Sequence, residues 1–158
     1  MTTETITKVV ETLLYEKDVN VGVNKVIEIV KECVNDLKNG NIEFEKLILT
    51  NKLTKPITSY DNKEPHVMVA IKMKERGRPS NVGDRIGYII TNNGKKLIGE
   101  RAEEADYVIE NNISVDVDYY INNQLIKPVL RMVSLFGITK DVLNVKLNDS
   151  QGTLMEYF

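Results

Sequence analysis

Residues 118–132 read DYYINNQLIKPVLRM, a stretch that combines helical periodicity with an internal proline. Apolar side chains recur at helical spacing over about 116–136, which predicts one long helix. Pro128 has no N–H to donate to the carbonyl of Gln124, four residues back. We therefore expect a bend near Asn123 and Gln124 that exposes their amide side chains.

Two further helices are predicted at the N-terminus. Apolar residues keep helical spacing over 6–14 and again over 23–37. Asp18 is suited to cap the second helix and Gly40 to end it. Because few residues separate the two helices, we expect them to form an antiparallel pair.

The middle of the chain predicts strands around one helix. A short strand-like run lies at 47–49, and Pro65 can open a helix that ends at Gly77. The segments RIGYIIT (85–91) and KKLIGER (95–101) flank NNG, which is a signal for a two-residue hairpin turn. The expected fold class is α+β: an antiparallel helix pair, a central helix, a small β-hairpin sheet and a long C-terminal helix.

The expected organisation has one domain with two parts and a tail. Residues 1–60 form the helical part, 61–146 the α+β part, and 147–158 a tether leading into the sequence QGTLMEYF. A chain of 158 residues is long enough to bury a core. The single cysteine, Cys33, is expected to be a small core residue. No apolar run reaches membrane-span length, and the first residues lack the apolar core of a secretory signal.

Charge is distributed unevenly along the chain. Segment 52–101 holds eleven Lys and Arg against five Asp and Glu, a net charge of +6, so the remainder carries −8 of the total of −2. A basic middle in an acidic protein indicates a surface for a polyanion. A solvated face without any partner would give the same pattern.

Catalytic and metal-binding signals are weak. His66 is a lone histidine, for which a structural role is the favoured interpretation over metal ligation. Asp116 and Asp118 could be read as a metal-binding pair, but residues two apart on a helix point away from each other. Asp116 is better explained as a helix cap and Asp118 as a first-turn acid.

Nucleic-acid binding has better support. Residues 50–55 combine hydroxyl and amide groups with two lysines, a mixture that suits phosphate contacts to a duplex. Aromatic residues make up only 6% of the chain, so a groove that stacks single-stranded bases is less favoured. In the tail, Leu154, Tyr157 and Phe158 fall at i, i+3 and i+4, with Gln151 one turn earlier. One helical turn would present them together to an apolar pocket of a partner. The alternative is that the tail packs back on its own domain.

Four stretches in order resemble the C-terminal thumb of family B replicative DNA polymerases, with archaeal and eukaryotic delta-type enzymes the most similar in character. They are PHVMVAIKMKERG, GDRIGYII, GERAEEADYV and DYYINNQLIKPVLRM, and the two N-terminal helices with LILTNKLTK extend the resemblance over residues 1–146. QGTLMEYF resembles the box by which proteins bind a PCNA-type sliding clamp. The resemblance implies that the chain holds primer–template duplex DNA by its backbone and supports processive replication.

The resemblance also implies site residues. Clamp binding would use Gln151, Leu154, Tyr157 and Phe158. DNA contacts would come from Asn51, Lys52, Thr54, Lys55, Arg78, Arg85, Arg101, Tyr120, Asn123 and Gln124.

One departure from the family limits the expected activity. The palm motifs with the catalytic aspartates are absent, and phosphoryl transfer needs metals held by such carboxylates. We therefore expect no catalytic residue and no cofactor in this chain, with Mg²⁺ acting in the complete polymerase. The chain is then an excised domain or a separate small subunit that partners a palm-containing catalytic chain, cytoplasmic in an archaeon or nuclear in a eukaryote. The alternative is a non-catalytic adaptor that links the sliding clamp to another protein.

Overall fold

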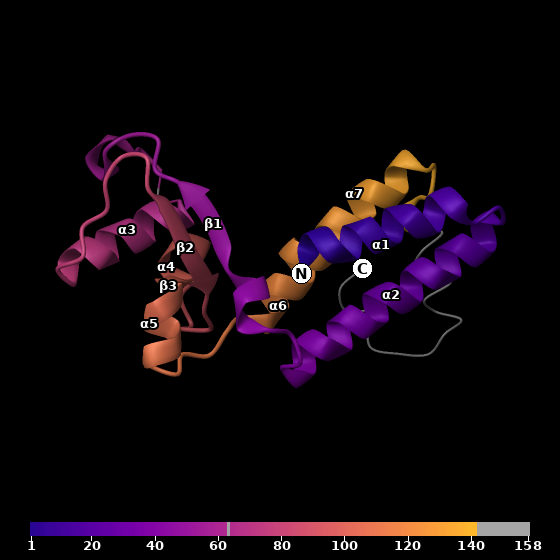
Figure 1. The fold of residues 1–158 in the computed structure, drawn as a ribbon, viewed down its shortest axis with the longest axis horizontal. Coiled ribbons are helices and arrows are strands. Elements are labelled where there is room, and N and C mark those ends of the chain that lie inside the picture. The colour runs from indigo at the N-terminus through magenta and orange to yellow at the C-terminus, as the bar shows by residue number, and fades with distance from the viewer. Residues whose placement is uncertain (63, 142–158) are drawn as a thin grey trace. The chain divides into compact units, whose positions relative to one another are not determined.

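The computed structural model describes residues 1–62 and 64–141, which fall into two compact units (Figure 1). Of the described residues, 1–43 and 117–141 belong to unit 1, and those within 44–116 belong to unit 2. This division differs from the expected parts 1–60 and 61–146, which stay a prediction. The chain leaves unit 1, builds unit 2 and returns, so no single cut in the sequence separates the two.

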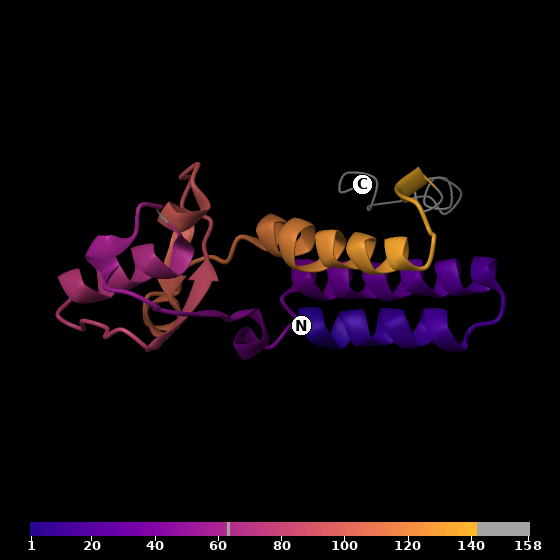
Figure 2. The ribbon, with the colours of Figure 1, turned by 90° about the horizontal axis from the view of Figure 1, so that it is seen from above.

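Unit 1 begins with an antiparallel pair of helices, as predicted. Helix α1 (Thr2–Tyr15) and helix α2 (Val19–Asn39) pack along each other (Figure 2). The Asp18 carboxylate accepts hydrogen bonds from the backbone N–H groups of Asn20 and Val21, at 2.8 and 3.2 Å. Gly40 ends α2 in a left-handed conformation with φ of 71°, which glycine adopts without steric cost. Both caps are confirmed.

The C-terminal part of unit 1 is a helix with an irregular centre. It consists of α6 (Val117–Tyr119), a π-helical segment η3 (Tyr120–Ile126) and α7 (Lys127–Leu135). The Lys127 N–H bonds to the carbonyl of Asn122, five residues back, immediately before Pro128. This wider turn changes the hydrogen-bond register where the proline has no N–H to donate, so the helix continues instead of ending.

The core of unit 1 is mainly aliphatic and is built from α1, α2, η3 and α7. Helix α1 packs on both α2 and α7, and η3 packs on α1 and α2. Cys33 is buried, as expected, and its sulfur lies 3.8 Å from the Thr5 hydroxyl. Burial raises the pKa of the Cys33 thiol. The other buried apolar side chains include Val9, Val23, Val26, Ile27, Val30, Val34, Leu37, Ile121, Leu125, Val129 and Val133.

Unit 2 is built on a three-stranded antiparallel sheet in the order β1-β2-β3. The strands are β1 (Leu49–Lys52), β2 (Arg85–Ile90) and β3 (Ala102–Glu104). Helix α3 (Pro65–Glu75) packs on the sheet, and Gly77 follows it with φ of 80°. The shorter helices are η1 (Phe44–Leu47), η2 (Ile57–Ser59), α4 (Ile98–Arg101) and α5 (Ala105–Glu110). The α+β class is confirmed.

The sheet differs from the expected hairpin in its second arm. Gly94 has a φ of 75°, as a turn at NNG requires, but KKLIGER ends in helix α4 instead of forming a strand. Strand β3 starts only at Ala102. The N–H and the hydroxyl of Thr91 both donate to the carbonyl of Arg101, at 2.9 and 2.7 Å. The residue that follows β2 is thus bonded to the last residue of α4, directly before β3. The strand predicted at 47–49 is likewise shifted along the chain, since β1 begins at Leu49 and ends at Lys52.

Candidate nucleic-acid interface

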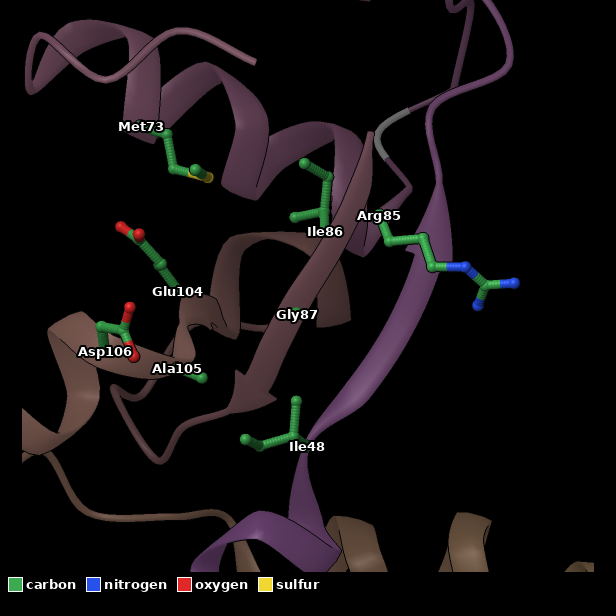
Figure 3. Close-up of a pocket in the computed structure, with 8 residues that line it drawn as sticks. All are labelled: Ile48, Met73, Arg85, Ile86, Gly87, Glu104, Ala105 and Asp106. Atoms are coloured by element: carbon green, nitrogen blue, oxygen red, sulfur yellow. The ribbon is translucent and has the colours of Figure 1, made fainter. Parts of the chain in front are cut away.

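Two cations lie directly opposite each other at one end of the sheet. The register of β1 and β2 pairs Lys52 with Arg85, and side chains of directly opposed residues share a face of the sheet. Both side chains are exposed, and within the described residues neither forms an ion pair with an acid. Figure 3 shows the Arg85 side chain directed away from Glu104 and Asp106. Like charges so placed repel each other, which a bound polyanion would relieve.

The segment after β1 is held by backbone hydrogen bonds around a buried leucine. Leu53 is 1% exposed, its N–H donates to the Asp84 carbonyl at 2.9 Å, and its carbonyl accepts from the Gly83 N–H at 2.7 Å. Since Leu53 points inward, its neighbours Thr54 and Lys55 are exposed. The chain thus presents its polar groups next to the Lys52–Arg85 pair.

Tyr60 holds this exposed segment from the other side. Its phenol oxygen accepts the Thr54 N–H at 2.9 Å and lies 3.2 Å from the Thr54 hydroxyl. The Lys55 ammonium stands over the ring, 4.8 Å from its centroid. The hydrogen bond with the Thr54 side chain is the largest cause of a lowered Tyr60 pKa. Sequence reasoning missed Tyr60, because nothing in its local pattern indicates this contact.

Asn51 is the remaining predicted contact on β1. Its amide donates to the Tyr88 hydroxyl at 3.3 Å across the strand pair, yet the residue as a whole is exposed. Because successive side chains of a strand point to opposite faces, Asn51 lies on the other face from Lys52, and its role in DNA binding stays a prediction. Lys52, Thr54, Lys55 and Arg85 are exposed near the end of β1 and the start of β2, and we call them the β1–β2 basic surface.

Two predicted contacts, Arg78 and Arg101, have their charge paired within unit 2. Arg78 donates to the Glu104 carboxylate at 2.7 Å. Arg101 donates to the carboxylate of Asp116, and its side chain is only 21% exposed. We therefore leave both out of the β1–β2 basic surface.

These pairs also correct the charge estimate for the middle of the chain. The +6 of segment 52–101 omits the acids that follow it, and unit 2 as a whole holds twelve basic and eleven acidic residues. Lys72 and Arg76 both bind Glu103, at 2.7 and 3.0 Å, and Arg76 also lies over the Tyr107 ring. The positive surface is thus local.

The predicted contacts on the C-terminal helix belong to unit 1. Tyr120 is 1% exposed, so its side chain cannot touch DNA in this conformation. It lies on η3, which packs against α1 and α2. Asn123 and Gln124 are half-buried and donate to the backbone carbonyl and the hydroxyl of Tyr119, at 3.3 and 3.4 Å. Their role in DNA binding stays a prediction.

The residues of the expected clamp box lie outside the described part of the chain: Gln151, Leu154, Tyr157 and Phe158.

His66 has a structural environment, in line with the favoured interpretation. It is 4% exposed and meets the Tyr60 ring edge-on at 5.8 Å. Within residues 1–62 and 64–141, no group of three or more His, Cys, Asp or Glu side chains is placed to hold a metal ion. Nor is any helix in this part of the chain long and apolar enough to cross a membrane.

Unit 2 also contains an open cavity of about 270 Å³ (Figure 3). Its lining combines apolar side chains with the carboxylates of Glu104 and Asp106. These acids would repel a phosphate. Arg85 of the basic surface borders the cavity, but its side chain is directed away from the two acids (Figure 3). The lining residues are Ile48, Met73, Arg85, Ile86, Gly87, Glu104, Ala105 and Asp106.

Comparison with known proteins gives the family. A family model described as DNA polymerase family B matches residues 1–136. The chain belongs to DNA polymerase family B. The resemblance to family B DNA polymerases is thereby confirmed, whereas the thumb and the clamp box stay predictions.

Relatives of this family B chain include archaeal and eukaryotic enzymes. It is 38% identical over 151 residues to a DNA polymerase of Methanocaldococcus jannaschii, covering 96% of this chain and 9% of that protein. It is 36% identical over 138 residues to the DNA polymerase delta catalytic subunit of Candida albicans, covering 85% and 13%.

The same family appears among solved structures. The family B DNA polymerase of Pyrobaculum calidifontis matches with a TM-score of 0.77 and 33% identity, over 88% of this chain and 18% of that one. The family B chain therefore spans only a small fraction, between 9% and 18%, of these polymerases.

Proposed function

We propose that this chain is the thumb portion, or a small subunit, of a family B DNA polymerase that grips primer–template duplex DNA by its backbone. The observation that carries the proposal is the exposed pair Lys52 and Arg85, directly opposed in the sheet register. Membership of a DNA polymerase family makes DNA the natural polyanion for this surface.

The β1–β2 basic surface has the groups that backbone binding requires. Lysine and arginine neutralise phosphates, and a hydroxyl group such as that of Thr54 adds a hydrogen bond that positions the duplex. None of this chemistry reads base sequence, so the affinity should be independent of sequence and fall steeply with salt. A sequence-independent grip is what processive synthesis needs, since the enzyme must hold every duplex it makes.

The test is duplex binding by the full 158-residue chain, followed by fluorescence anisotropy at several salt concentrations. Each phosphate contact contributes about 0.9 to the slope of log affinity against log salt. Lys52→Ala combined with Arg85→Ala should therefore weaken binding and reduce the slope by about 1.8.

The matched control is Lys8→Ala combined with Lys17→Ala, which removes two exposed cations from unit 1. The net charge changes equally, but the β1–β2 basic surface is intact, so the slope should stay close to that of the unaltered chain. If both double variants change affinity and slope alike, the effect is one of overall charge and the assigned surface is wrong.

We further propose that residues 151–158 dock on a PCNA-type sliding clamp, with Leu154, Tyr157 and Phe158 entering an apolar pocket and Gln151 hydrogen-bonding beside it. The support is the spacing of these side chains and the family to which the chain belongs. We propose no catalytic step for this chain, because its sequence lacks the palm motifs with the catalytic aspartates, and Mg²⁺ would act in the palm-containing partner. Clamp binding without any DNA affinity would instead identify an adaptor.

A further inference from the structure

We propose that Tyr60 is a positioning residue that holds Thr54 and Lys55 in place for DNA binding. The inference rests on the proposed role of the β1–β2 basic surface and goes beyond it, because Tyr60 itself carries no charge. It also explains how Thr54 and Lys55, which lie beyond the end of β1, can be held in fixed positions.

The segment after β1 is tied to the sheet only as far as Leu53 by the backbone bonds to Gly83 and Asp84. A hydrogen bond from the Ser59 N–H to the Pro56 carbonyl, at 2.9 Å, is internal to the loop and does not anchor it. The Thr54 N–H donates instead to the phenol oxygen of Tyr60. The Tyr60 side chain therefore accepts a backbone hydrogen bond that, within the sheet, a neighbouring strand would accept.

Tyr60 makes two kinds of contact with the presented groups. Its oxygen meets both the N–H and the hydroxyl of Thr54, at 2.9 and 3.2 Å. Its ring lies under the Lys55 ammonium, with 4.8 Å between the nitrogen and the ring centroid. A cation held over an aromatic face keeps its charge outward and loses side-chain freedom before DNA arrives.

The ring is anchored at its other side to helix α3. His66, in the first turn of that helix, is 4% exposed and meets the Tyr60 ring edge-on, with centroids 5.8 Å apart at 89°. Tyr60 thus connects a buried residue of the unit 2 core to the exposed Thr54 and Lys55. Through Tyr60, helix α3 is thus connected to the β1–β2 basic surface.

Tyr60→Phe tests this role in the full chain. The substitution keeps the ring, with its contacts to Lys55 and His66, and removes only the hydroxyl that binds Thr54. Duplex affinity should fall about three- to tenfold, the range for loss of a hydrogen bond. The salt slope should change little, because Lys55 keeps its charge and its contact with the ring.

A double-mutant cycle separates positioning from a direct or merely structural effect. In a chain that already carries Thr54→Val and Lys55→Ala, Tyr60→Phe should have no further effect on affinity, because nothing remains to be positioned. An undiminished loss in that background would overturn the proposal. So would an unchanged affinity in the otherwise unaltered chain.

Tyr107→Phe is the matched control. Tyr107 lies in the same unit, is half-buried and has a cation over its ring, with Arg76 at 3.5 Å. Removing its hydroxyl should leave DNA affinity unchanged, and an equal loss there would count against Tyr60. If Lys52→Ala with Arg85→Ala weakens binding but Tyr60→Phe does not, this inference alone fails. If neither does, the proposed function fails with it.

Discussion

Arg101 illustrates, at the scale of a single residue, how a cation can serve stability instead of binding. Its guanidinium donates to the carboxylate of Asp116, and the two side chains are 21% and 11% exposed. Removing one partner of a mostly buried pair leaves the other charge desolvated without compensation. The contribution of Arg101 to binding a phosphate should be correspondingly small.

We expect Arg101→Ala to lower the free energy of unfolding by roughly 2 to 3 kcal/mol, somewhat less than for a fully buried pair. Urea denaturation followed by circular dichroism measures this change. Lys96→Ala, an exposed position in the same unit, should alter stability by less than about 0.5 kcal/mol. A stable Arg101→Ala chain with strongly weakened DNA binding would show that the ion pair is not its main role.

At the scale of the element, helix α2 depends on its N-cap. The Asp18 carboxylate bonds two N–H groups of the first turn that have no partner inside the helix. Asp18→Ala removes these bonds and should lower the free energy of unfolding by about 1 kcal/mol. Thermal and urea denaturation of the full chain measure the loss.

Asp18→Asn provides the control for this prediction. An asparagine oxygen can accept the same hydrogen bonds without the negative charge, so most of the stability should be kept. If Asp18→Asn is as destabilising as Asp18→Ala, the charge at the helix N-terminus is responsible and the hydrogen bonds are not.

At the scale of the whole molecule, the proposed function joins a DNA grip to a clamp-binding tail. Tyr157→Ala combined with Phe158→Ala should abolish binding to a purified archaeal PCNA-type sliding clamp, since each buried aromatic is expected to contribute about 2 kcal/mol or more. Isothermal titration calorimetry measures the binding. The melting temperature should stay unchanged, because a tail that binds a partner does not support the core.

Met155→Ala combined with Glu156→Ala is the matched control, as it alters the same octapeptide at positions outside the spacing of the box. This variant should bind the clamp nearly as well as the unaltered chain. A fall of several degrees in the melting temperature of the Tyr157 and Phe158 variant, with clamp binding retained, would instead place the tail in the core.

The sequence by itself determined the local features of this protein. Asp18 and Gly40 were recognisable as the two ends of α2, and Pro65 and Gly77 as the limits of the α3 region, because capping and turn preferences depend on neighbouring residues alone. The sequence also predicted a bend near Asn123 and Gln124 that exposes their amides. A π-helical segment lies there instead, and the expected exposure was wrong because both side chains are half-buried and bond to Tyr119.

Only the tertiary structure decided which charges are available. Arg101 and Asp116 are 15 residues apart and Arg78 and Glu104 are 26 apart, so no local pattern shows that they pair. The β1–β2 basic surface is therefore much smaller than the basic segment 52–101 from which it was predicted. The contact of Tyr60 with Thr54 depends likewise on how the chain turns after β1. Periodicity and capping act within a turn of chain, whereas ion pairing and burial depend on elements that only folding brings together.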